Sequence, residues 1–363
     1  MIELRDKLII LHIAKIKNGL YDGVSVVVPQ HIIHQSEYAM VGFLNVYNVK
    51  IEGVSNQFDF TKPFNINVLP VPFNKPDLVV FHEVYCSEYL KLSKNLRENS
   101  IPYIIIPHGE LTNGAQKKKW LKKKVANFLL FNKYIKGATA IQCLSQNELS
   151  STKFGKNKFV GTNGITLPDK RKQSFHTDKI RFTYIGRLDP YHKGLDLLIK
   201  TIALKKDILN ENNCRFVIHG PDTFGRGDKI RNLIKGNNVE NLVELRSEVS
   251  GSEKENILLD SDIFIQTSRF EGMPMGILEA LSYGLPVLIT EGTMLGGLVK
   301  DYNAGWVSET TVDSIGEILE KAIAEKALFA EKSGKAIELI KDNFEWSKVA
   351  SSTIEKYKEI IEY

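Results

Sequence analysis

The sequence predicts an α/β protein with two doubly wound parallel sheets. Short apolar and β-branched segments alternate with helical patterns along the chain, which is typical of parallel sheets covered by helices on both faces. With 363 residues, the chain exceeds what one hydrophobic core usually supports. A polar stretch at 167–179 follows an Asn-Gly turn at 163–164 and separates the two halves. We therefore expect two Rossmann-like domains at 1–166 and 167–343, and a helix over 344–363 that packs back toward the N-terminal domain.

The expected strands are the apolar runs bounded by turn residues, and the expected helices lie between them. In the first half the strands are 7–13, 46–52, 78–81, 102–107, 140–144 and 158–161. In the second half they are 180–185, 215–219, 243–245, 263–266, 286–289 and 305–307. The main helices are 31–38, 87–99, 147–153, 195–208 and 314–332.

The composition favours a cytoplasmic protein with a sizeable core, since 43% of the residues are hydrophobic. Cys86, Cys143 and Cys214 are widely separated and odd in number, which argues against a disulfide framework or a zinc site. The apolar run 8–13 is too short for a secretory or membrane-spanning segment, and no other stretch reaches spanning length.

A lysine cluster lies at 117–124, where six of eight residues are lysine. Without these six lysines the net charge of +5 becomes −1, so the positive charge is local. Such a cluster suits peripheral contact with the anionic inner face of a membrane, and it equally suits a solvated helix start. We expect no nucleic-acid partner, because Trp120 is the only aromatic residue within the cluster.

The most informative segment is 269–281, which places Glu271 on a loop and Glu279 on a helix. A buried strand at 261–267 precedes the loop, and the helix at 277–283 ends at Gly284. Two carboxylates at this spacing suit the vicinal hydroxyls of a sugar and a ribose. The alternative is that Glu271 caps the helix and Glu279 is a solvated helix residue.

The gap between the two carboxylates fits a diphosphate. We expect free backbone N–H groups at Met275 and Gly276, where the helix dipole also favours negative charge. Gly272 and Gly276 allow the backbone to approach the ligand closely, and Met273 lies between them. The combination predicts a nucleotide-sugar site.

Two further groups of polar residues follow expected strands, and such positions lie at the ligand-binding edge of a doubly wound sheet. Arg187 and Lys193 follow a strand and Gly186, and together they suit a leaving diphosphate, although surface basicity is the alternative. His108 follows the strand at 102–107 and suits a sugar hydroxyl or a proton transfer, although it also suits a structural role. His82 is as easily structural as functional.

Several other kinds of site are not indicated. A full Gly-x-Gly-x-x-Gly fingerprint, a Gly-x-Ser-x-Gly elbow and a Walker loop are missing from the sequence. Asp260 and Asp262 lack the histidines or cysteines that would support a metal site. The sequence therefore argues against a dinucleotide-dependent oxidoreductase, a hydrolase and a kinase.

Taken in order, the motifs resemble family 4 retaining glycosyltransferases of GT-B fold, also described as glycosyl transferases group 1. The resemblance covers nearly the whole chain. The residues that carry it are Pro107-His108-Gly109, Asn163-Gly164-Ile165, Arg187 and Lys193 after Gly186, His219-Gly220-Pro221, Glu271 and Glu279 with seven residues between them, and Phe344 with Trp346.

The resemblance implies two Rossmann-like domains that face each other across a cleft, with the acceptor in the N-terminal domain and the donor in the C-terminal one. It implies that Arg187 and Lys193 hold the diphosphate, Glu279 the ribose and Glu271 the donor sugar hydroxyls, with His108 beside the transferred sugar. The family's N-terminal glycine pair appears in interrupted form as Gly19 and Gly23, so Gly23 is the candidate contact of that loop. No protein nucleophile and no metal are implied.

The expected function is transfer of a sugar, with retention, from a UDP- or GDP-sugar to a hydroxyl of a growing, lipid-linked surface oligosaccharide or polysaccharide such as an O-antigen or capsule. The nucleotide sugar is a co-substrate, and we expect no other cofactor. The alternatives are a sugar-nucleotide epimerase of the same fold and a non-catalytic carbohydrate-binding protein.

Overall fold

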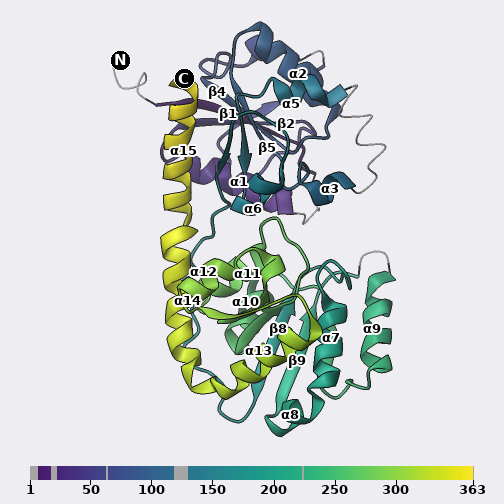
Figure 1. Ribbon diagram of the computed structural model, residues 1–363. Helices are drawn as coiled ribbons and strands as arrows, with labels where there is room; N and C mark the ends of the chain where they lie inside the picture. Colours follow the sequence, from purple (N-terminus) through teal and green to yellow (C-terminus); the bar gives the residue numbers. More distant parts are fainter. Residues whose placement is uncertain (1–6, 18–22, 63, 118–129, 223–224, 363) are drawn as a thin grey trace. The chain divides into compact units, whose positions relative to one another are not determined.

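A computed structural model describes residues 7–17, 23–62, 64–117, 130–222 and 225–362. The chain forms two compact units: unit 1 comprises 1–164 and 346–363, and unit 2 comprises 165–345. Each contains a parallel sheet with helices on its faces, which confirms the α/β class and the two Rossmann-like sheets (Figure 1).

Unit 1 has a seven-stranded sheet in the described part of the chain, with the order β3-β2-β1-β4-β5-β6-β7. The order reverses between β1 and β4, which is the switch point where doubly wound sheets bind ligands. Its elements are β1 (Ile9–Ala14), α1 (Gly23–Gln35), β2 (Met40–Asn45), β3 (Asn56–Asp59), β4 (Leu78–His82), α2 (Ser87–Glu98), β5 (Tyr103–Ile106), α3 (Asn113–Lys117), α5 (Asn132–Lys136), β6 (Ala140–Cys143), α6 (Gln146–Ser151), β7 (Lys158–Val160) and α15 (Trp346–Glu362).

Most strands of unit 1 match the expected segments, but the strand expected at 46–52 is wrong. The segment 46–52 begins as a turn, and β2 lies just before it at Met40–Asn45. A glycine inside a strand usually weakens it, so Gly42 made β2 difficult to predict from the sequence. Gly42 is needed here because a Cβ would lie 2.7 Å from the Phe73 ring. The helix expected at 31–38 also begins earlier, at Gly23, and contains Pro29.

The helix α15 belongs to unit 1 and packs on α1. At its first residue, the Trp346 ring lies edge-on to His31, with ring centroids 4.9 Å apart, and stacks on His34. Farther along α15, the buried Tyr357 hydroxyl donates to Gln142 Oε1 on β6 at 2.6 Å. The end of the chain therefore completes the face of the unit 1 sheet that α1 covers.

Unit 2 has a six-stranded sheet among its described residues, with the order β10-β9-β8-β11-β12-β13 and a switch point between β8 and β11. Its elements are β8 (Ile180–Ile185), α7 (Leu195–Leu204), α8 (Lys206–Glu211), β9 (Cys214–His219), α9 (Arg226–Gly236), β10 (Val243–Arg246), α10 (Gly251–Asp260), β11 (Ile263–Gln266), α11 (Met275–Ser282), β12 (Val287–Thr290), α12 (Gly296–Asp301), β13 (Gly305–Ser308), α13 (Val312–Ala324) and α14 (Phe329–Asn343).

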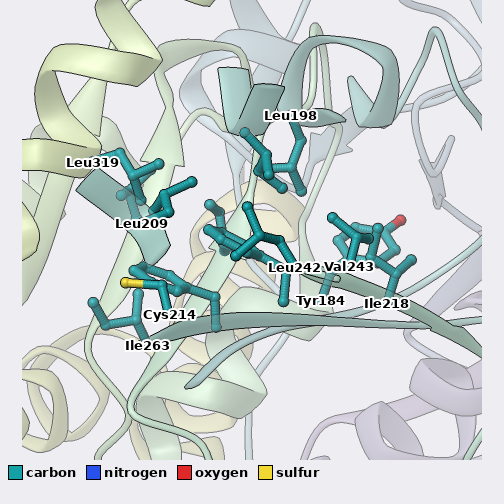
Figure 2. Packing of buried hydrophobic residues seen from close by; sticks show 14 of the residues in the cluster. Tyr184, Leu198, Leu209, Cys214, Ile218, Leu242, Val243, Ile263 and Leu319 are labelled. Atoms are coloured by element: carbon teal, nitrogen blue, oxygen red, sulfur yellow. The ribbon is translucent and has the colours of Figure 1, made fainter. Parts of the chain in front are cut away.

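The central strands β11 and β12 of unit 2 are buried on both faces, where side chains alternate across each strand. Ile263 and Ile265 of β11 join a cluster with α7, α9 and α13, while Phe264 joins the opposite cluster with α11 and α14. Figure 2 shows part of the first cluster, in which Leu198 and Leu319 pack over the sheet. The second half therefore has two hydrophobic layers around one sheet.

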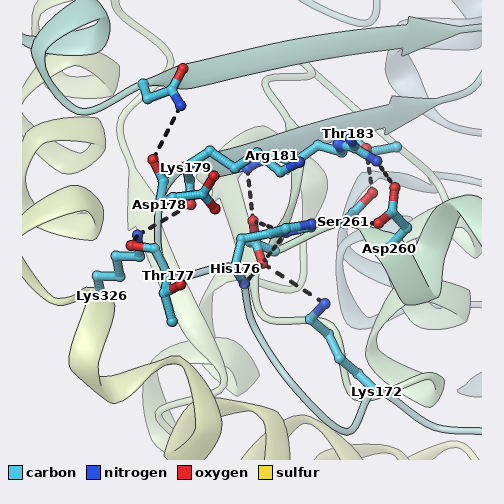
Figure 3. A network of polar contacts seen from close by, with 12 residues as sticks. Lys172, His176, Thr177, Asp178, Lys179, Arg181, Thr183, Asp260, Ser261 and Lys326 are labelled. Atoms are coloured by element: carbon cyan, nitrogen blue, oxygen red, sulfur yellow. Dashed lines mark hydrogen bonds and ion pairs between the residues drawn. The ribbon is translucent and has the colours of Figure 1, made fainter.

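A buried polar network fixes the entry of the chain into β8 (Figure 3). Lys172 Nζ and Asp262 Oδ1 lie 3.8 Å apart and are nearly inaccessible, and burial lowers the pKa of Lys172. Asp262 also accepts hydrogen bonds from the backbone N–H of Arg181 and from His176. Asp262 is thus a structural residue at the start of β11.

Two expected helices of unit 2 are each divided. The helix expected at 195–208 ends at Leu204, and α8 begins at Lys206. The helix expected at 314–332 is α13 followed by a separate α14 that continues to Asn343. Apolar periodicity continues through such breaks, so the pattern alone does not reveal them.

Candidate active site

The loops that follow β8 and β11 meet at the switch point of unit 2 and carry the predicted residues Arg187, Lys193 and Glu271. Lys193 Nζ lies 2.7 Å from Glu271 Oε1, and their side chains are only 13% and 8% exposed. A cation and a carboxylate so far from solvent interact more strongly than a surface pair. The structure therefore brings two predicted site residues together as an ion pair.

The Glu271 carboxylate is held by its own loop as well. Gln266 Nε2 and Ser268 Oγ both donate to Oε1, at 2.9 and 2.6 Å. Helix α11 has Pro274 at its N-cap, without a side-chain hydrogen bond to the cap. Glu271 therefore does not cap the helix, which excludes the alternative interpretation of this residue.

Backbone contacts hold the two loops against each other. Gly194 has φ 64°, and a Cβ at this position would overlap the Thr267 carbonyl. Thr267 Oγ1 donates to the Gly194 carbonyl at 2.9 Å. Arg269 adds a bidentate ion pair with Asp196 at 2.7 and 2.8 Å. The glycine after Lys193 is thus required by the close approach of the β11 loop.

The helix start differs in part from the expectation. The predicted free N–H of Met275 is wrong, because this group donates to the Met273 carbonyl at 3.0 Å in a tight turn. The N–H of Gly276 has no acceptor within the described residues. A Cβ on Gly272 would touch nothing within 4 Å, whereas one on Gly276 would lie 3.3 Å from the Ile185 carbonyl. Space is therefore open over Gly272.

Glu279 lies on α11 and forms an ion pair that the sequence did not reveal. Its Oε1 lies 2.6 Å from Lys254 Nζ of α10, and both side chains are 28% exposed. Lys254 is distant in sequence and belongs to no motif, so only the packing of α10 beside α11 identifies it. Glu279 is thus more than a solvated helix residue.

Arg187 is exposed, and its guanidinium has no ion-pair partner in the part of the chain that the structure describes. Its backbone carbonyl accepts a hydrogen bond from the buried Tyr184 hydroxyl at 2.9 Å. Burial raises the pKa of Tyr184, so the hydroxyl stays a donor. The loop is therefore fixed while the Arg187 side chain stays available.

In unit 1, His108 follows β5 in the left-handed backbone region with φ 47°, and Gly109 follows with φ 83°. Non-glycine residues are uncommon in this region and often lie at functional sites. The turn is held by the buried Glu148, whose Oε1 accepts from Gly109 N–H at 2.6 Å and whose Oε2 accepts from Leu144 N–H at 2.7 Å. Sequence reasoning missed Glu148.

His108 lies at the end of a row of buried polar side chains on the sheet face covered by α1. His82 Nδ1 lies 3.1 Å from His108 Nε2, and His12 Nδ1 lies 2.9 Å from His82 Nε2. His12 Nε2 in turn lies 3.0 Å from Gln35 Oε1. Burial lowers the pKa of His108 and of His12 to about 3, and that of His82 well below its usual value. His12 and Gln35 were not identified from the sequence.

Gly23 is exposed and is the first residue of α1. The other glycine of that loop, Gly19, lies outside the described residues, and so does the lysine cluster from 118 to 124. In the described ranges, no group of three or more His, Cys, Asp or Glu side chains is placed to hold a metal ion. Within the same ranges, none of the helices has both the length and the hydrophobicity of a membrane span.

Comparison with known proteins identifies the C-terminal half. Residues 167–340 match the family described as "Glycosyl transferases group 1". This part of the chain is a glycosyl transferases group 1 domain. The resemblance expected from the motifs is confirmed at this level.

Two curated relatives match about half of this chain. An uncharacterized glycosyltransferase of Methanocaldococcus jannaschii is 25% identical over 193 residues, which are 52% of this chain and 47% of that protein. A poly(ribitol-phosphate) alpha-N-acetylglucosaminyltransferase of Staphylococcus aureus is 28% identical over 194 residues, which are 52% of this chain and 37% of that protein. The chain thus spans less than half the length of these relatives.

A structural similarity extends over both units. The crystal structure of Anabaena HepE in complex with UDP has a TM-score of 0.73 and covers 97% of this chain and 100% of HepE, at 15% sequence identity. The group 1 domain thus forms part of a GT-B fold, as the sequence predicted.

Proposed function

We propose that this group 1 protein is a retaining glycosyltransferase of the family 4 type. It transfers a sugar from a UDP- or GDP-sugar to a hydroxyl of a growing, lipid-linked surface oligosaccharide or polysaccharide such as an O-antigen or capsule. The observation that carries the proposal is the Lys193–Glu271 pair at the switch point of unit 2, near Arg187, whose guanidinium has no ion-pair partner among the described residues. The HepE complex with UDP and the S. aureus transferase support the donor and the acceptor class.

In this proposal, Arg187 and Lys193 bind the donor diphosphate. Their positive charge offsets the charge that develops on the leaving group, as a preorganised electrostatic site does. The N–H of Gly276 at the start of α11, which has no acceptor among the described residues, adds a hydrogen-bond donor. The open space over Gly272, between Glu271 and Met273, admits the diphosphate. The site needs no metal ion for this task, and transfer is expected to continue in EDTA.

Glu271 is proposed to bind the hydroxyls of the donor sugar. Its Oε1 already accepts from Lys193, Gln266 and Ser268, whereas Oε2 has no partner in the described part of the chain. A carboxylate oxygen without a partner is a strong acceptor for a sugar hydroxyl. Glu279 is proposed to accept the ribose hydroxyls beside Lys254.

The chemical step proposed for the retaining reaction is attack by the acceptor hydroxyl on the same face that the diphosphate leaves. The phosphate oxygen takes the acceptor proton as the bond from C1 to the phosphate oxygen breaks and the new glycosidic bond forms. We assign no protein nucleophile. His108 is proposed to hydrogen-bond a hydroxyl of the transferred sugar, with Gly23 near the acceptor.

The test is a thermal-shift panel of UDP, GDP, ADP and their sugars on the wild type and on Glu279→Ala. A ligand at 100 times its Kd stabilises the folded state by about 2.7 kcal/mol. We expect a shift with one nucleotide family, smaller in Glu279→Ala and unchanged in Glu338→Ala. Glu338 is an exposed α14 residue that forms an ion pair with Lys335 of the same helix. Equal shifts in all three proteins would contradict the site, and the lack of any shift would favour the carbohydrate-binding alternative.

An acceptor requirement separates the transferase from a sugar-nucleotide epimerase. Free nucleotide is expected to appear only when an acceptor saccharide is added to the protein and its donor. Conversion of the donor sugar without any acceptor would establish the epimerase instead.

The proposed location is the cytoplasm, with peripheral contact at the inner membrane face through the lysine cluster at 117–124. Each lysine near an anionic surface contributes about 1 kcal/mol to binding. Replacing all six lysines with Gln is therefore expected to abolish sedimentation with phosphatidylserine vesicles. Unchanged sedimentation would contradict this location.

A further inference from the structure

Five of the protein's eight histidines lie within unit 1 and pack on one another or on Trp346. Three of them, His12, His82 and His108, form a single row of ring-to-ring hydrogen bonds that ends at Gln35. Each neutral ring has only one donor and one acceptor. The position of the hydrogen on each ring therefore depends on its neighbour.

The direction of every bond in the row follows from Gln35. Its Oε1 is an acceptor only, so His12 Nε2 must donate to it, which leaves His12 Nδ1 without a hydrogen. His82 Nε2 must then donate to His12 Nδ1, and His82 Nδ1 is bare. By the same step His108 Nε2 donates to His82 Nδ1. The last atom of the row, His108 Nδ1, is left as an acceptor.

These bond directions hold for neutral rings, and the surroundings keep the rings neutral. His12 and His82 are fully buried, and the other titratable side chain that faces them is His31 of α1, itself buried. His31 donates through Nε2 to Asn163 Oδ1 at 2.9 Å, and its Nδ1 has no partner among the residues that the structure describes. Burial lowers the pKa of His31 to about 4, so it adds no positive charge at neutral pH.

Gln35 fixes the end of the row. It is fully buried on α1, and its Oε1 faces His12. The carbonyl oxygen of the amide, rather than its amino group, is therefore directed at the row.

We propose that Gln35, acting through His12 and His82, locks His108 in the tautomer whose bare Nδ1 accepts a hydrogen bond from a substrate hydroxyl. The substrate part of this inference rests on the proposed function. Gln35, His12 and His82 are positioning residues, since they act on the substrate only through His108. The row fixes a tautomer and does not carry a proton away from His108, because the Gln35 amide oxygen does not take up a proton at ordinary pH.

The tautomer can be measured without any substrate. We would label the full-length protein with ¹⁵N-histidine, assign His108 from His108→Gln, and record the ¹⁵N shifts of its two ring nitrogens at pH 7.5. A protonated and a bare nitrogen differ widely in ¹⁵N shift. We expect Nε2 protonated and Nδ1 bare in the wild type, and a mixture of tautomers in Gln35→Met, which keeps the side-chain length but removes the amide oxygen.

His34→Gln is the matched control, because His34 lies on the same helix and stacks on Trp346 outside the row. It is expected to keep the wild-type tautomer. Protonated Nδ1 in the wild type, or the same single tautomer in Gln35→Met, would overturn the lock. If Gln35→Met does not fold, the wild-type spectrum still decides.

Activity gives the second measurement. Gln35→Met is expected to lower the kcat of transfer about five- to tenfold with little change in the nucleotide KM, because one hydrogen bond to the sugar is weakened. Unchanged kcat would overturn the link from the tautomer to the substrate. If no transfer is found even in the wild type, the proposed function fails, while the ¹⁵N result still decides the lock.

Discussion

In unit 1, His12 and His82 meet across the switch point between β1 and β4 as neutral rings, whereas the switch point of unit 2 is occupied by the charged pair of Lys193 and Glu271. The two sheets have the same strand order around these points. Hydrogen bonds between neutral rings depend on which atom carries each hydrogen, while an ion pair depends on charge. The same topology therefore supports hydrogen-bonded neutral rings in one unit and, in the other, an ion pair that we propose to bind the donor phosphates.

The largest expected effect is on the charged site. Glu271→Gln removes the charge that Lys193 faces and changes the acceptor that Gln266 and Ser268 share. We expect transfer kcat/KM to fall about 100- to 1,000-fold, the scale of losing one preorganised electrostatic contact. Steady-state kinetics against Glu338→Gln, an exposed position on α14, checks this. A loss below about fivefold would mean that Glu271 does not touch the donor.

The neutral site is expected to respond to pH. The pKa values of His12 and His31 are about 3 and about 4 in the folded protein, and near 6.5 when unfolded. Below pH 6.5 the unfolded chain binds protons that the folded chain does not. The free energy of unfolding therefore has its full value above this pH and decreases as the pH falls toward 4. At pH 5 the loss is about 2 kcal/mol for each ring.

Urea unfolding at pH 7.5 and pH 5.0 measures this loss. His31→Gln stays neutral at both pH values, so its loss is expected to be about 2 kcal/mol smaller than that of the wild type. The same loss in both proteins would show that His31 does not contribute.

Alanine substitutions at two glycines, Gly194 and Gly225, test the contact between the two loops of unit 2. Gly194 and Gly225 have nearly the same φ, 64° and 63°, but only Gly194 faces a backbone carbonyl, while a Cβ on Gly225 meets nothing within 4 Å. Alanine in the left-handed region costs about 1–2 kcal/mol at either position. Gly194→Ala is expected to lower the free energy of unfolding by about 2 kcal/mol more than Gly225→Ala does, as measured by denaturant unfolding. Equal losses would mean that the loops separate easily.

The smallest expected effect concerns Lys254. Its pair with Glu279 is 28% exposed on each side, and such pairs contribute about 0.2–1 kcal/mol. Lys254→Gln is expected to weaken nucleotide binding about threefold at low salt and to make no difference at 0.5 M NaCl, where the charge is screened. Calorimetric titration at both salt concentrations checks this, and a threefold loss that persists in high salt would contradict the charge argument.

The sequence was most informative where buried strands are continuous apolar runs. Every expected strand of unit 2 is present, and 263–266 matches in full, because turn residues bound these runs clearly. The strand at 40–45 was missed because Gly42 is explained by the Phe73 and Phe58 rings, which come from later segments of the chain. Local sequence patterns thus predict an element well when the residues that determine it are close to one another in the sequence.

The same limit applies to the candidate site. The positions of Arg187, Lys193 and Glu271 at the ends of strands followed from motifs, and the roles proposed for them remain predictions. The pairing of Lys193 with Glu271 depends on β8 lying beside β11, and Lys254 and Gln35 come from segments without any motif. A residue that acts by supporting another leaves little signal in one sequence.

The return of α15 to unit 1 has a consequence for synthesis on the ribosome. All of unit 2 lies within 165–345, whereas unit 1 needs Trp346 and the residues after it. Unit 1 therefore starts before unit 2 but is completed after it, and the face beside His31 stays uncovered until α15 emerges. Domains usually fold in the order of their synthesis. In this chain the second unit can fold to completion while the first still lacks its last helix.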